Sequence, residues 1–249
     1  MNDWTTAKII KIKKWKNNLF SIILNASINP FIPGQFSRLS YLNKNGERIQ
    51  RAYSYINAPS NQNLEFYIVL IPNGQLTPTL YNLSNQDRIM IKKIASGFFT
   101  LNEIPSCKNL WMYATGTGIG PYLSILQSKE NTDKFENIIL VHAVRYCDDL
   151  VYLPLIKKLK DEYQGKLYIQ IIISREFTKF SLYGRIPELL KNNILEKKIG
   201  IKIKKHTCHV MLCGNPNMVR NTQKFLIEER NLNKNFRKKP GQITSENYW

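Results

Sequence analysis

The sequence predicts a two-domain fold, with an N-terminal six-stranded antiparallel β-barrel followed by a C-terminal α/β domain built on a parallel sheet. Two observations predict it. Short β-rich segments separated by turn residues run from about residue 6 to residue 94, whereas short apolar strands alternate with amphipathic helical segments after residue 110. Because that alternation is typical of a parallel sheet covered on both faces, we place a boundary near residue 105 and expect domains 1–105 and 106–249.

Alternating or β-rich segments that lie between Asn-, Gly- and Pro-rich turns predict the strands of the N-terminal domain. The turns fall at residues 17–18, 30–34, 43–46, 58–63 and 72–74. The strands are expected at residues 7–15, 19–24, 35–42, 47–56, 64–70 and 88–94. One helix is expected at residues 76–83. Six short strands with little helix favour a small antiparallel barrel.

The C-terminal elements follow a connector at residues 101–109. Strands are expected at residues 110–114, 138–144, 167–174 and 209–213. Helices are expected at residues 121–127, 153–163, 186–195 and 216–229. No internal repeat or low-complexity tract interrupts this order.

The charge of the chain is strongly positive, with 36 Lys and Arg against 18 Asp and Glu in 249 residues, a formal net charge of +18. Such a balance is compatible with nucleic acid, an anionic membrane surface or an acidic protein partner. The lysines are scattered without the aromatic residues that stack on bases, and the wealth of Lys, Asn and Ile is also typical of an AT-rich genome. We expect no nucleic-acid or membrane partner, and a basic face for an acidic protein.

Other compositional features indicate an intracellular protein. The four cysteines form no C-x-x-C pair, no apolar run approaches membrane-spanning length, and the first residues lack the features of a signal peptide. We therefore expect a cytoplasmic location.

A glycine-rich sequence, Gly116-Thr117-Gly118-Ile119-Gly120-Pro121, separates an apolar strand from a helix. Glycines let the backbone turn closely, and free N–H groups at such a turn can seat a pyrophosphate. The G-x-G-x-x-G dinucleotide fingerprint nevertheless fails at Pro121, and many glycine turns are simple connections. A nucleotide site and a plain connection both remain open from this motif alone.

Ligands of parallel sheets gather at the carboxyl ends of the strands. There the sequence places Arg145, Ser174 and Arg175, with Arg185 nearby, and Cys213-Gly214-Asn215-Pro216 after the last predicted strand. Arginine forks match phosphate geometry, although single arginines on a basic protein are commonly surface residues. Since Arg145 stands where an acidic residue would bind a ribose hydroxyl, the pattern favours NADP over NAD.

Two further groups need interpretation. Arg51-Ala52-Tyr53-Ser54-Tyr55 places Arg51, Tyr53 and Tyr55 on one strand face, which suits either a ligand site or ordinary cross-strand packing. His206, Cys208, His209 and Cys213 have metal-ligating chemistry, but an extended segment divides them between two faces, so we expect no metal site. His142 lies in an apolar strand and is expected to be a core or cleft histidine.

The ordered motifs together resemble the bacterial ferredoxin/flavodoxin–NADP reductases. These motifs are R-x-Y-S at residues 51–54, G-T-G-I-G-P at 116–121, C-G-N-P at 213–216 and the ending Glu246-Asn247-Tyr248-Trp249. The resemblance runs the full length and includes residues 34–36, 95–99, 150–154 and 184–187.

The resemblance implies two cofactors, FAD and NADP(H). It assigns Arg51 to the FAD pyrophosphate, Tyr53 to the flavin ring and Ser54 to flavin N5. The remaining FAD residues that it implies are Ala52, Tyr67, Gly74, Gln75, Leu76, Thr117, Tyr248 and Trp249. For NADP it implies Gly116, Thr117, Gly118, Arg145, Ser174, Arg175, Arg185, Gly214, Asn215 and Pro216. The residues assigned to the reacting atoms are Ser54, Tyr53 and Cys213.

The resemblance also implies a reaction, in which NADPH delivers a hydride to FAD and single electrons pass to an acidic flavodoxin or ferredoxin. The enzyme is expected to be a monomer. A reductase component or flavin reductase serving another acceptor is an alternative within the same chemistry. A basic nucleic-acid-binding barrel protein is the alternative from another class.

Overall fold

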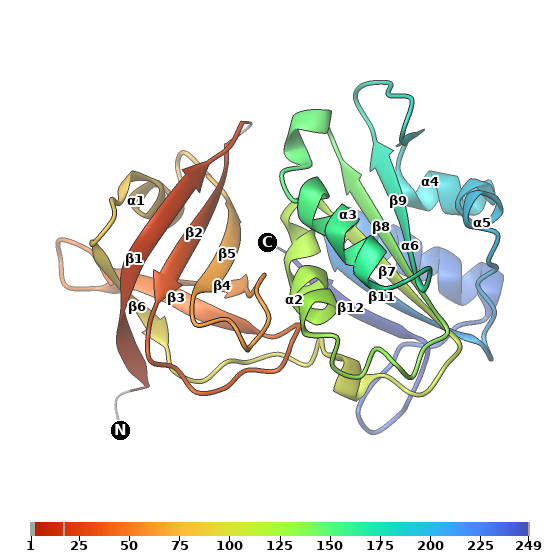
Figure 1. The fold of residues 1–249 in the computed structure, drawn as a ribbon, viewed down its shortest axis with the longest axis horizontal. Coiled ribbons are helices and arrows are strands. Elements are labelled where there is room, and N and C mark those ends of the chain that lie inside the picture. The colour runs from red at the N-terminus through yellow and green to blue at the C-terminus, as the bar shows by residue number, and fades with distance from the viewer. Residues whose placement is uncertain (1–2, 17, 249) are drawn as a thin grey trace. The chain divides into compact units, whose positions relative to one another are not determined.

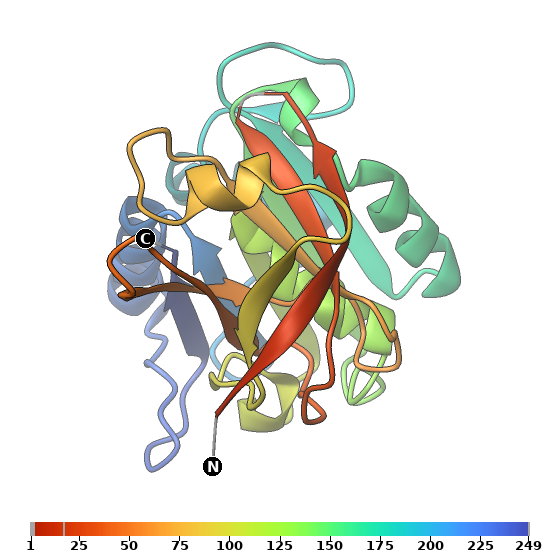
Figure 2. The same ribbon diagram turned by 90° about the vertical axis from the view of Figure 1, so that its left-hand side faces the viewer.

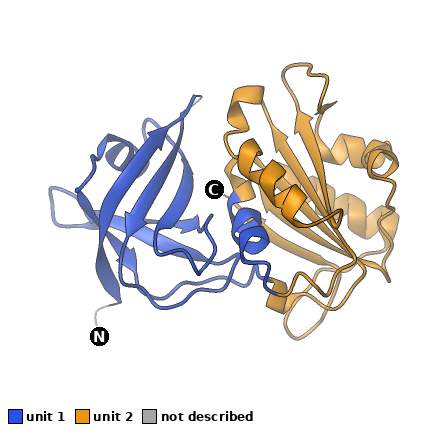
Figure 3. Cartoon of the chain, viewed as in Figure 1, with its two compact units in different colours: residues 1–100, 120–130 blue, residues 101–119, 131–249 orange. Residues whose placement is uncertain are grey.

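The computed structural model describes residues 3–16 and 18–248 and divides the chain into two compact units (Figure 3). The barrel unit contains residues 1–100 and 120–130, and the α/β unit contains residues 101–119 and 131–249.

The barrel unit is a six-stranded antiparallel sheet in the order β4-β3-β6-β1-β2-β5 (Figures 1 and 2). Its strands are β1 Trp4–Lys14, β2 Leu19–Asn25, β3 Phe36–Leu42, β4 Arg48–Ser54, β5 Leu64–Val69 and β6 Arg88–Lys92. An antiparallel bridge between Tyr55 and Phe66 joins the two outer strands, so the sheet closes on itself. The prediction of a six-stranded antiparallel barrel is confirmed.

The barrel core follows the two-residue period of its strands. In β2, Phe20, Ile22 and Leu24 are fully buried and pack with Phe66 and Ile68 of β5. The short helix α1, Thr77–Asn82, adds Leu80 to the same core. Alternating apolar side chains therefore fill the barrel interior.

Helix α2, Gly120–Ser128, clusters with the barrel unit. The Ser124 hydroxyl donates to the carbonyl oxygen of Asn57 at 2.8 Å, and Gln127 Nε2 donates to that of Ile56 at 2.7 Å. The predicted helix began at Pro121. In the structure it begins at Gly120, so Pro121 is its second residue. Proline is tolerated there because neither position donates an intrahelical hydrogen bond.

The α/β unit is a six-stranded parallel sheet in the order β10-β9-β8-β7-β11-β12 (Figure 1). Its strands are β7 Asn109–Thr115, β8 Asn137–Val144, β9 Leu167–Ile173, β10 Leu182–Tyr183, β11 Cys208–Gly214 and β12 Ile243–Asn247. The parallel α/β class is confirmed, but the sequence interpretation found four of these strands and missed β10 and β12. Both are short, and four of the five residues of β12 are polar, so neither carries the apolar run that marked the others.

Helices cover both faces of this sheet. They are α3 Leu153–Glu162, α4 Ile186–Lys191, α5 Ile194–Ile199 and α6 Pro216–Arg230. In β9, Tyr168 and Ile172 pack in the cluster of α4 and α6, whereas Ile171 and Ile173 pack with residues around α3. The predicted single helix over residues 186–195 is wrong, because Asn193 adopts a left-handed φ of 56° and separates α4 from α5.

Three short 3₁₀ segments complete the unit, at Leu101–Glu103, Gly116–Ile119 and Cys147–Asp149. The second of these, called the glycine turn below, directly follows β7. Over the part of the chain that the structure describes, the helices are all too short or too polar to cross a bilayer.

Candidate functional site

The glycine turn lies against the end of β11, and its glycines permit this close approach. A Cβ atom on Gly118 would stand 2.7 Å from the carbonyl oxygen of Cys213 and 2.8 Å from Gly214 Cα. Gly116 has a φ of +52°, and open space surrounds its Cβ position. The turn therefore presents backbone without side chains, which suits the close approach of a ligand's phosphates.

The end of β11 is joined to the end of β7 by a side chain. The Asn215 N–H donates to the Thr115 hydroxyl oxygen at 2.8 Å. Gly214, with a φ of +128°, leaves room for that hydroxyl, since a Cβ there would collide with it. Asn215 Oδ1 then accepts from the N–H groups of Asn217 at 2.9 Å and Met218 at 3.3 Å, and Pro216 begins α6. The C-G-N-P motif thus ends a strand and caps a helix.

Three arginines come from adjacent strands at the carboxyl edge of the sheet. Arg145 follows β8, and Arg175 follows β9; the Arg175 N–H donates to the Arg145 carbonyl oxygen at 3.1 Å. Ser174 Oγ lies 3.3 Å from the Val144 carbonyl oxygen. Arg185 follows β10, which pairs with β9, and immediately precedes α4. The structure therefore brings together the four residues predicted to bind the 2′-phosphate.

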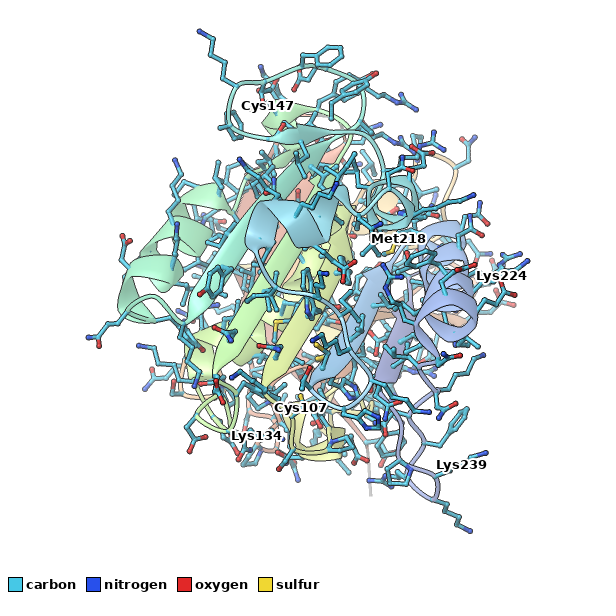
Figure 4. All side chains as sticks on the ribbon, turned by 90° about the vertical axis from the view of Figure 1, so that its right-hand side faces the viewer. Cys107, Lys134, Cys147, Met218, Lys224 and Lys239 are labelled. Atoms are coloured by element: carbon cyan, nitrogen blue, oxygen red, sulfur yellow. The ribbon has the colours of Figure 1, made fainter. Side chains whose placement is uncertain are left out.

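The three guanidinium groups are exposed and available to an anion. No carboxylate of the described residues forms an ion pair with them. Arg175 instead contacts Tyr146, with Nη1 at 3.4 Å from the phenol oxygen and the guanidinium over the ring. Figure 4 labels Cys147 at this end of the α/β unit, whereas Cys107, Lys134 and Lys239 lie at the opposite end. Those two lysines therefore add no charge beside the arginines.

The last strand brings the chain's C-terminal residues next to Cys213. Glu246 is the register partner of Cys213 in the β11–β12 pair, and the Tyr248 N–H donates to the Gly214 carbonyl oxygen at 2.9 Å. Burial raises the pKa of the Cys213 thiol well above its usual value, and the Glu246 carboxylate raises it further, against a hydrogen bond from Tyr248. Cys213 is therefore a neutral thiol in the resting protein. Trp249 lies outside the described residues.

In the barrel unit, strand β4 meets the loop that precedes α1. Arg51 is exposed, and its Nη2 lies 3.4 Å from Gln75 Oε1, a long contact that links β4 to residues 74–76. Tyr53 is half-buried on the same face, and burial raises the pKa of its phenol, against the opposing effect of Arg51. The structure therefore brings Arg51, Tyr53 and Gln75 together.

Ser54 ends β4 and is 7% exposed, and within the described residues no partner accepts from its hydroxyl. Ala52 is exposed on β4, Gly74 is half-buried, and Leu76 lies in the barrel core, so Leu76 offers a ligand only its backbone. Tyr67 is buried on the face of β5 opposite Phe66 and Ile68. Tyr55, by contrast, stacks on Phe31 at 3.9 Å inside the barrel, which is the ordinary packing alternative.

The donor chemistry suits two phosphate-bearing cofactors. Where β4 meets residues 74–76, the barrel unit offers the exposed guanidinium of Arg51, a half-buried aromatic ring and a hydroxyl that has no hydrogen-bond partner among the described residues. The α/β unit offers a bare glycine turn and three exposed guanidinium groups that form no ion pair with a carboxylate of the described residues. These are the groups that FAD and NADP would require, and both sets fit.

Metal-ligating chemistry does not converge in the described part of the chain, where no three His, Cys, Asp or Glu side chains are placed to hold an ion. Cys208 Sγ contacts Asn109 Nδ2 at 3.7 Å, and His209 Nε2 lies 2.9 Å from Thr244 Oγ1. The two neighbouring side chains thus engage different partners.

Comparison with known proteins decides the family. Residues 112–224 match the model of the oxidoreductase NAD-binding domain. The flavodoxin/ferredoxin–NADP reductase of Buchnera aphidicola subsp. Baizongia pistaciae is 66% identical over 249 residues, covering 100% of both chains. The Escherichia coli K12 protein of the same name is 51% identical, with equal coverage. The chain belongs to the flavodoxin/ferredoxin–NADP reductase family.

A solved structure agrees with this assignment. The ferredoxin NADP+ reductase of Neisseria gonorrhoeae, with bound FAD and NADP, is 32% identical, has a TM-score of 0.92 and covers 99% of each chain. Membership of this oxidoreductase family argues against the alternative of a nucleic-acid-binding protein, which the positive charge had left open.

The sequence interpretation missed two contacts at this site. Thr115 ties the ends of β7 and β11, and His142 Nε2 lies 3.0 Å from the Gly116 carbonyl oxygen. The strand-ending position of Thr115 beside a glycine could have pointed to the first. The second joins residues 26 positions apart, and only the parallel β7–β8 register places them together.

Proposed function

We propose that this reductase binds FAD and NADPH, takes a hydride from NADPH and delivers electrons singly to a flavodoxin or a ferredoxin. The names of the relatives with 66% and 51% identity support this function, as does the bound FAD and NADP of the Neisseria structure. The observation in this chain that carries it is the row of three exposed guanidinium groups, none of them ion-paired with a carboxylate of the described residues, beside the bare glycine turn. Bound FAD supplies the chemistry, because a flavin accepts a hydride and releases electrons one at a time.

In the proposal, the barrel residues hold and orient the flavin cofactor. Arg51 pairs with the FAD pyrophosphate, because its guanidinium is exposed and meets no carboxylate among the described side chains. The Tyr53 ring lies against the isoalloxazine, with the backbone of residues 74–76, Ala52 and Tyr67 completing the cradle. The Ser54 hydroxyl donates a hydrogen bond near flavin N5. Tyr248 and Trp249 stack on the cofactor.

The α/β residues hold NADPH by its phosphates and nicotinamide. The backbone of Gly116, Thr117 and Gly118 receives the pyrophosphate, while Arg145, Ser174, Arg175 and Arg185 grip the adenosine 2′-phosphate. Gly214, Asn215 and Pro216 line the nicotinamide side. Cys213 packs beside the reacting carbon as an uncharged thiol, which excludes water without adding charge. In functional terms we place the domain boundary near residue 105, and the C-terminal tail of the NADP-binding domain contributes to FAD binding.

The excess of positive charge supports an acidic carrier as the partner. A net charge of +18 steers an acidic protein toward the enzyme by long-range attraction. Because this attraction is screened, the rate with the carrier should fall steeply between about 0.05 M and about 0.5 M salt. We propose a monomeric enzyme that meets this carrier transiently in the cytoplasm.

A panel of acceptors tests the proposal. FAD-loaded enzyme is assayed with NADPH and either flavodoxin, ferredoxin or free flavin at rising salt. Faster, salt-sensitive reduction of one of the two proteins would support it. Rapid reduction of free flavin alone, insensitive to salt, would instead favour the alternative of a flavin reductase or a reductase component for another acceptor.

A further inference from the structure

His142 is a buried histidine that belongs to neither of the assigned cofactor sets. It lies near the end of β8 with 2% of its surface exposed, and its register partner in β7 is Ala114, two residues before Gly116. His142 Nε2 lies 3.0 Å from the carbonyl oxygen of Gly116. Since that oxygen can only accept, Nε2 carries the proton and the ring is the donor.

The Gly116 bond is the ring's one polar contact among the described residues, where Nδ1 has no partner. Burial lowers the pKa of His142 to about 4, against smaller opposite effects of the Gly116 carbonyl and the Asp149 carboxylate. The ring is therefore neutral at physiological pH and keeps the Nε2–H tautomer.

The hydrogen bond from His142 fixes the orientation of the whole peptide group between Gly116 and Thr117, and not only the carbonyl oxygen. In a planar trans peptide the carbonyl and the following N–H point in opposite directions, and the described backbone contains no cis peptide. Holding the Gly116 carbonyl therefore directs the Thr117 N–H away from His142. Gly116 needs such a restraint, because a glycine samples many backbone conformations and its φ here is +52°.

The end of β8 also forms backbone hydrogen bonds with the segment that carries Ser174 and Arg175. The carbonyl oxygens of Val144 and Arg145 accept from the N–H groups of Ser174 and Arg175, both at 3.1 Å. The end of β8 thus contacts the glycine turn through His142 and the arginine edge through its backbone. These two contacts act on different parts of an NADP molecule.

We propose that His142 is a positioning residue for the nucleotide, whose Nε2–H donor holds the peptide between Gly116 and Thr117 so that its N–H faces the pyrophosphate. The inference rests on the proposed NADP site. It predicts a selective effect. Removing the donor should lower the affinity for ligands that carry a pyrophosphate and leave unchanged the affinity for ligands that carry only the 2′-phosphate.

The test measures equilibrium binding by calorimetry, with FAD-loaded full-length protein and two probes. NADP+ contains the pyrophosphate, whereas adenosine 2′-monophosphate lacks it. His142→Phe should weaken NADP+ binding about 3- to 10-fold, the effect of one lost hydrogen bond, and leave adenosine 2′-monophosphate within about twofold. His142→Gln, whose amide can donate from a similar position, should recover most of the NADP+ affinity.

His209→Phe is the matched control. His209 is also a buried histidine of this sheet. Its ring contacts Thr244 and the backbone of Gly241, and its register partner Leu110 lies at the other end of β7. Its loss should leave both affinities unchanged. Unaltered NADP+ binding in His142→Phe, equal weakening of both probes, or no recovery in His142→Gln would each overturn the inference.

A wild-type measurement covers the case in which His142→Phe fails to fold. Nitrogen-15 NMR of the histidine rings should show His142 as the Nε2–H tautomer and uncharged down to about pH 5. An Nδ1–H tautomer would refute the hydrogen bond, because Nε2 would then have no proton to donate. If wild-type protein binds neither probe, the proposed NADP site itself is wrong, a result separate from any variant's behaviour.

Discussion

The backbone N–H of Asn215 donates to the hydroxyl of Thr115 across 2.8 Å, joining the ends of two neighbouring parallel strands that carry the glycine turn and the start of α6. Gly214 makes this possible because it has no Cβ to displace the hydroxyl. Beyond the backbone pairing of β7 and β11, one side chain therefore joins the two loops that the proposal assigns to the nucleotide.

Replacing that hydroxyl should loosen the connection. Thr115→Val keeps the shape but removes the acceptor, and should lower the free energy of unfolding by about 1–2 kcal/mol because the Asn215 N–H loses its partner. Thr115→Ser keeps the hydroxyl and should lie within about 0.5 kcal/mol of wild type. Urea unfolding measures both. A loss in Thr115→Ser with none in Thr115→Val would show that the methyl group, and not the hydrogen bond, matters.

The glycine turn should tolerate a methyl group at one glycine and resist it at another. Gly118→Ala places a Cβ against the Cys213–Gly214 backbone at 2.7–2.8 Å, so the turn must move and the cost should be about 3 kcal/mol. Gly116→Ala meets no atom within 4 Å and should cost about 1 kcal/mol, from its φ of +52° alone. Thermal unfolding compares the stability of the two variants. Similar losses of stability would contradict the close approach of Gly118 to the Cys213–Gly214 backbone.

Sequence reasoning located the glycine turn and the strand-end arginines because both follow from local patterns. An apolar strand that ends in glycines, or in Arg145 or Arg175, needs no tertiary information to be recognised. Grouping the three arginines required only the assumption of a parallel sheet.

The rest depends on tertiary contacts. Strand β12 reads Ile-Thr-Ser-Glu-Asn, and its pairing with β11 overrides a sequence with little strand character of its own. Alternation placed Tyr53 and Tyr55 on one face but could not tell that Tyr55 stacks on Phe31 in the core while Tyr53 stays half-buried. His142 has an unremarkable sequence context, and its partner is fixed only by the register of β7 and β8.

The arginine edge should set the preference between the two dinucleotides. Arg175→Ala should reduce kcat/KM for NADPH about 10- to 100-fold and leave that for NADH nearly unchanged, because only NADPH carries the 2′-phosphate. Arg88→Ala, which removes an exposed arginine of the barrel strand β6, controls for the loss of one positive charge. Equal losses with NADPH and NADH would remove Arg175 from the proposed phosphate site.

Stability should fall in mild acid because two buried histidines resist protonation. Burial lowers the pKa of His142 to about 4 and that of His209 to about 3. Between these values and the unfolded pKa of about 6.5, the unfolded chain binds more protons, so stability decreases as the pH falls. From pH 7 to pH 5, each histidine should cost about 2 kcal/mol.

Urea unfolding at the two pH values measures this loss. His142→Phe and His209→Phe should each reduce the pH-dependent part by about half, whatever their effect on stability at pH 7. If the free energy of unfolding of the double variant still falls as much between pH 7 and pH 5 as that of the wild type, other groups cause the acid sensitivity.

The most direct test of the account is an anaerobic titration of the purified, FAD-supplemented protein with NADPH, with NADH as comparison, followed by flavin absorbance. The account predicts tightly held FAD whose visible absorbance is lost on adding about one equivalent of NADPH, with a much slower loss on adding NADH. A correctly folded protein that retains no FAD, or whose bound flavin keeps its absorbance in excess NADPH, would contradict it.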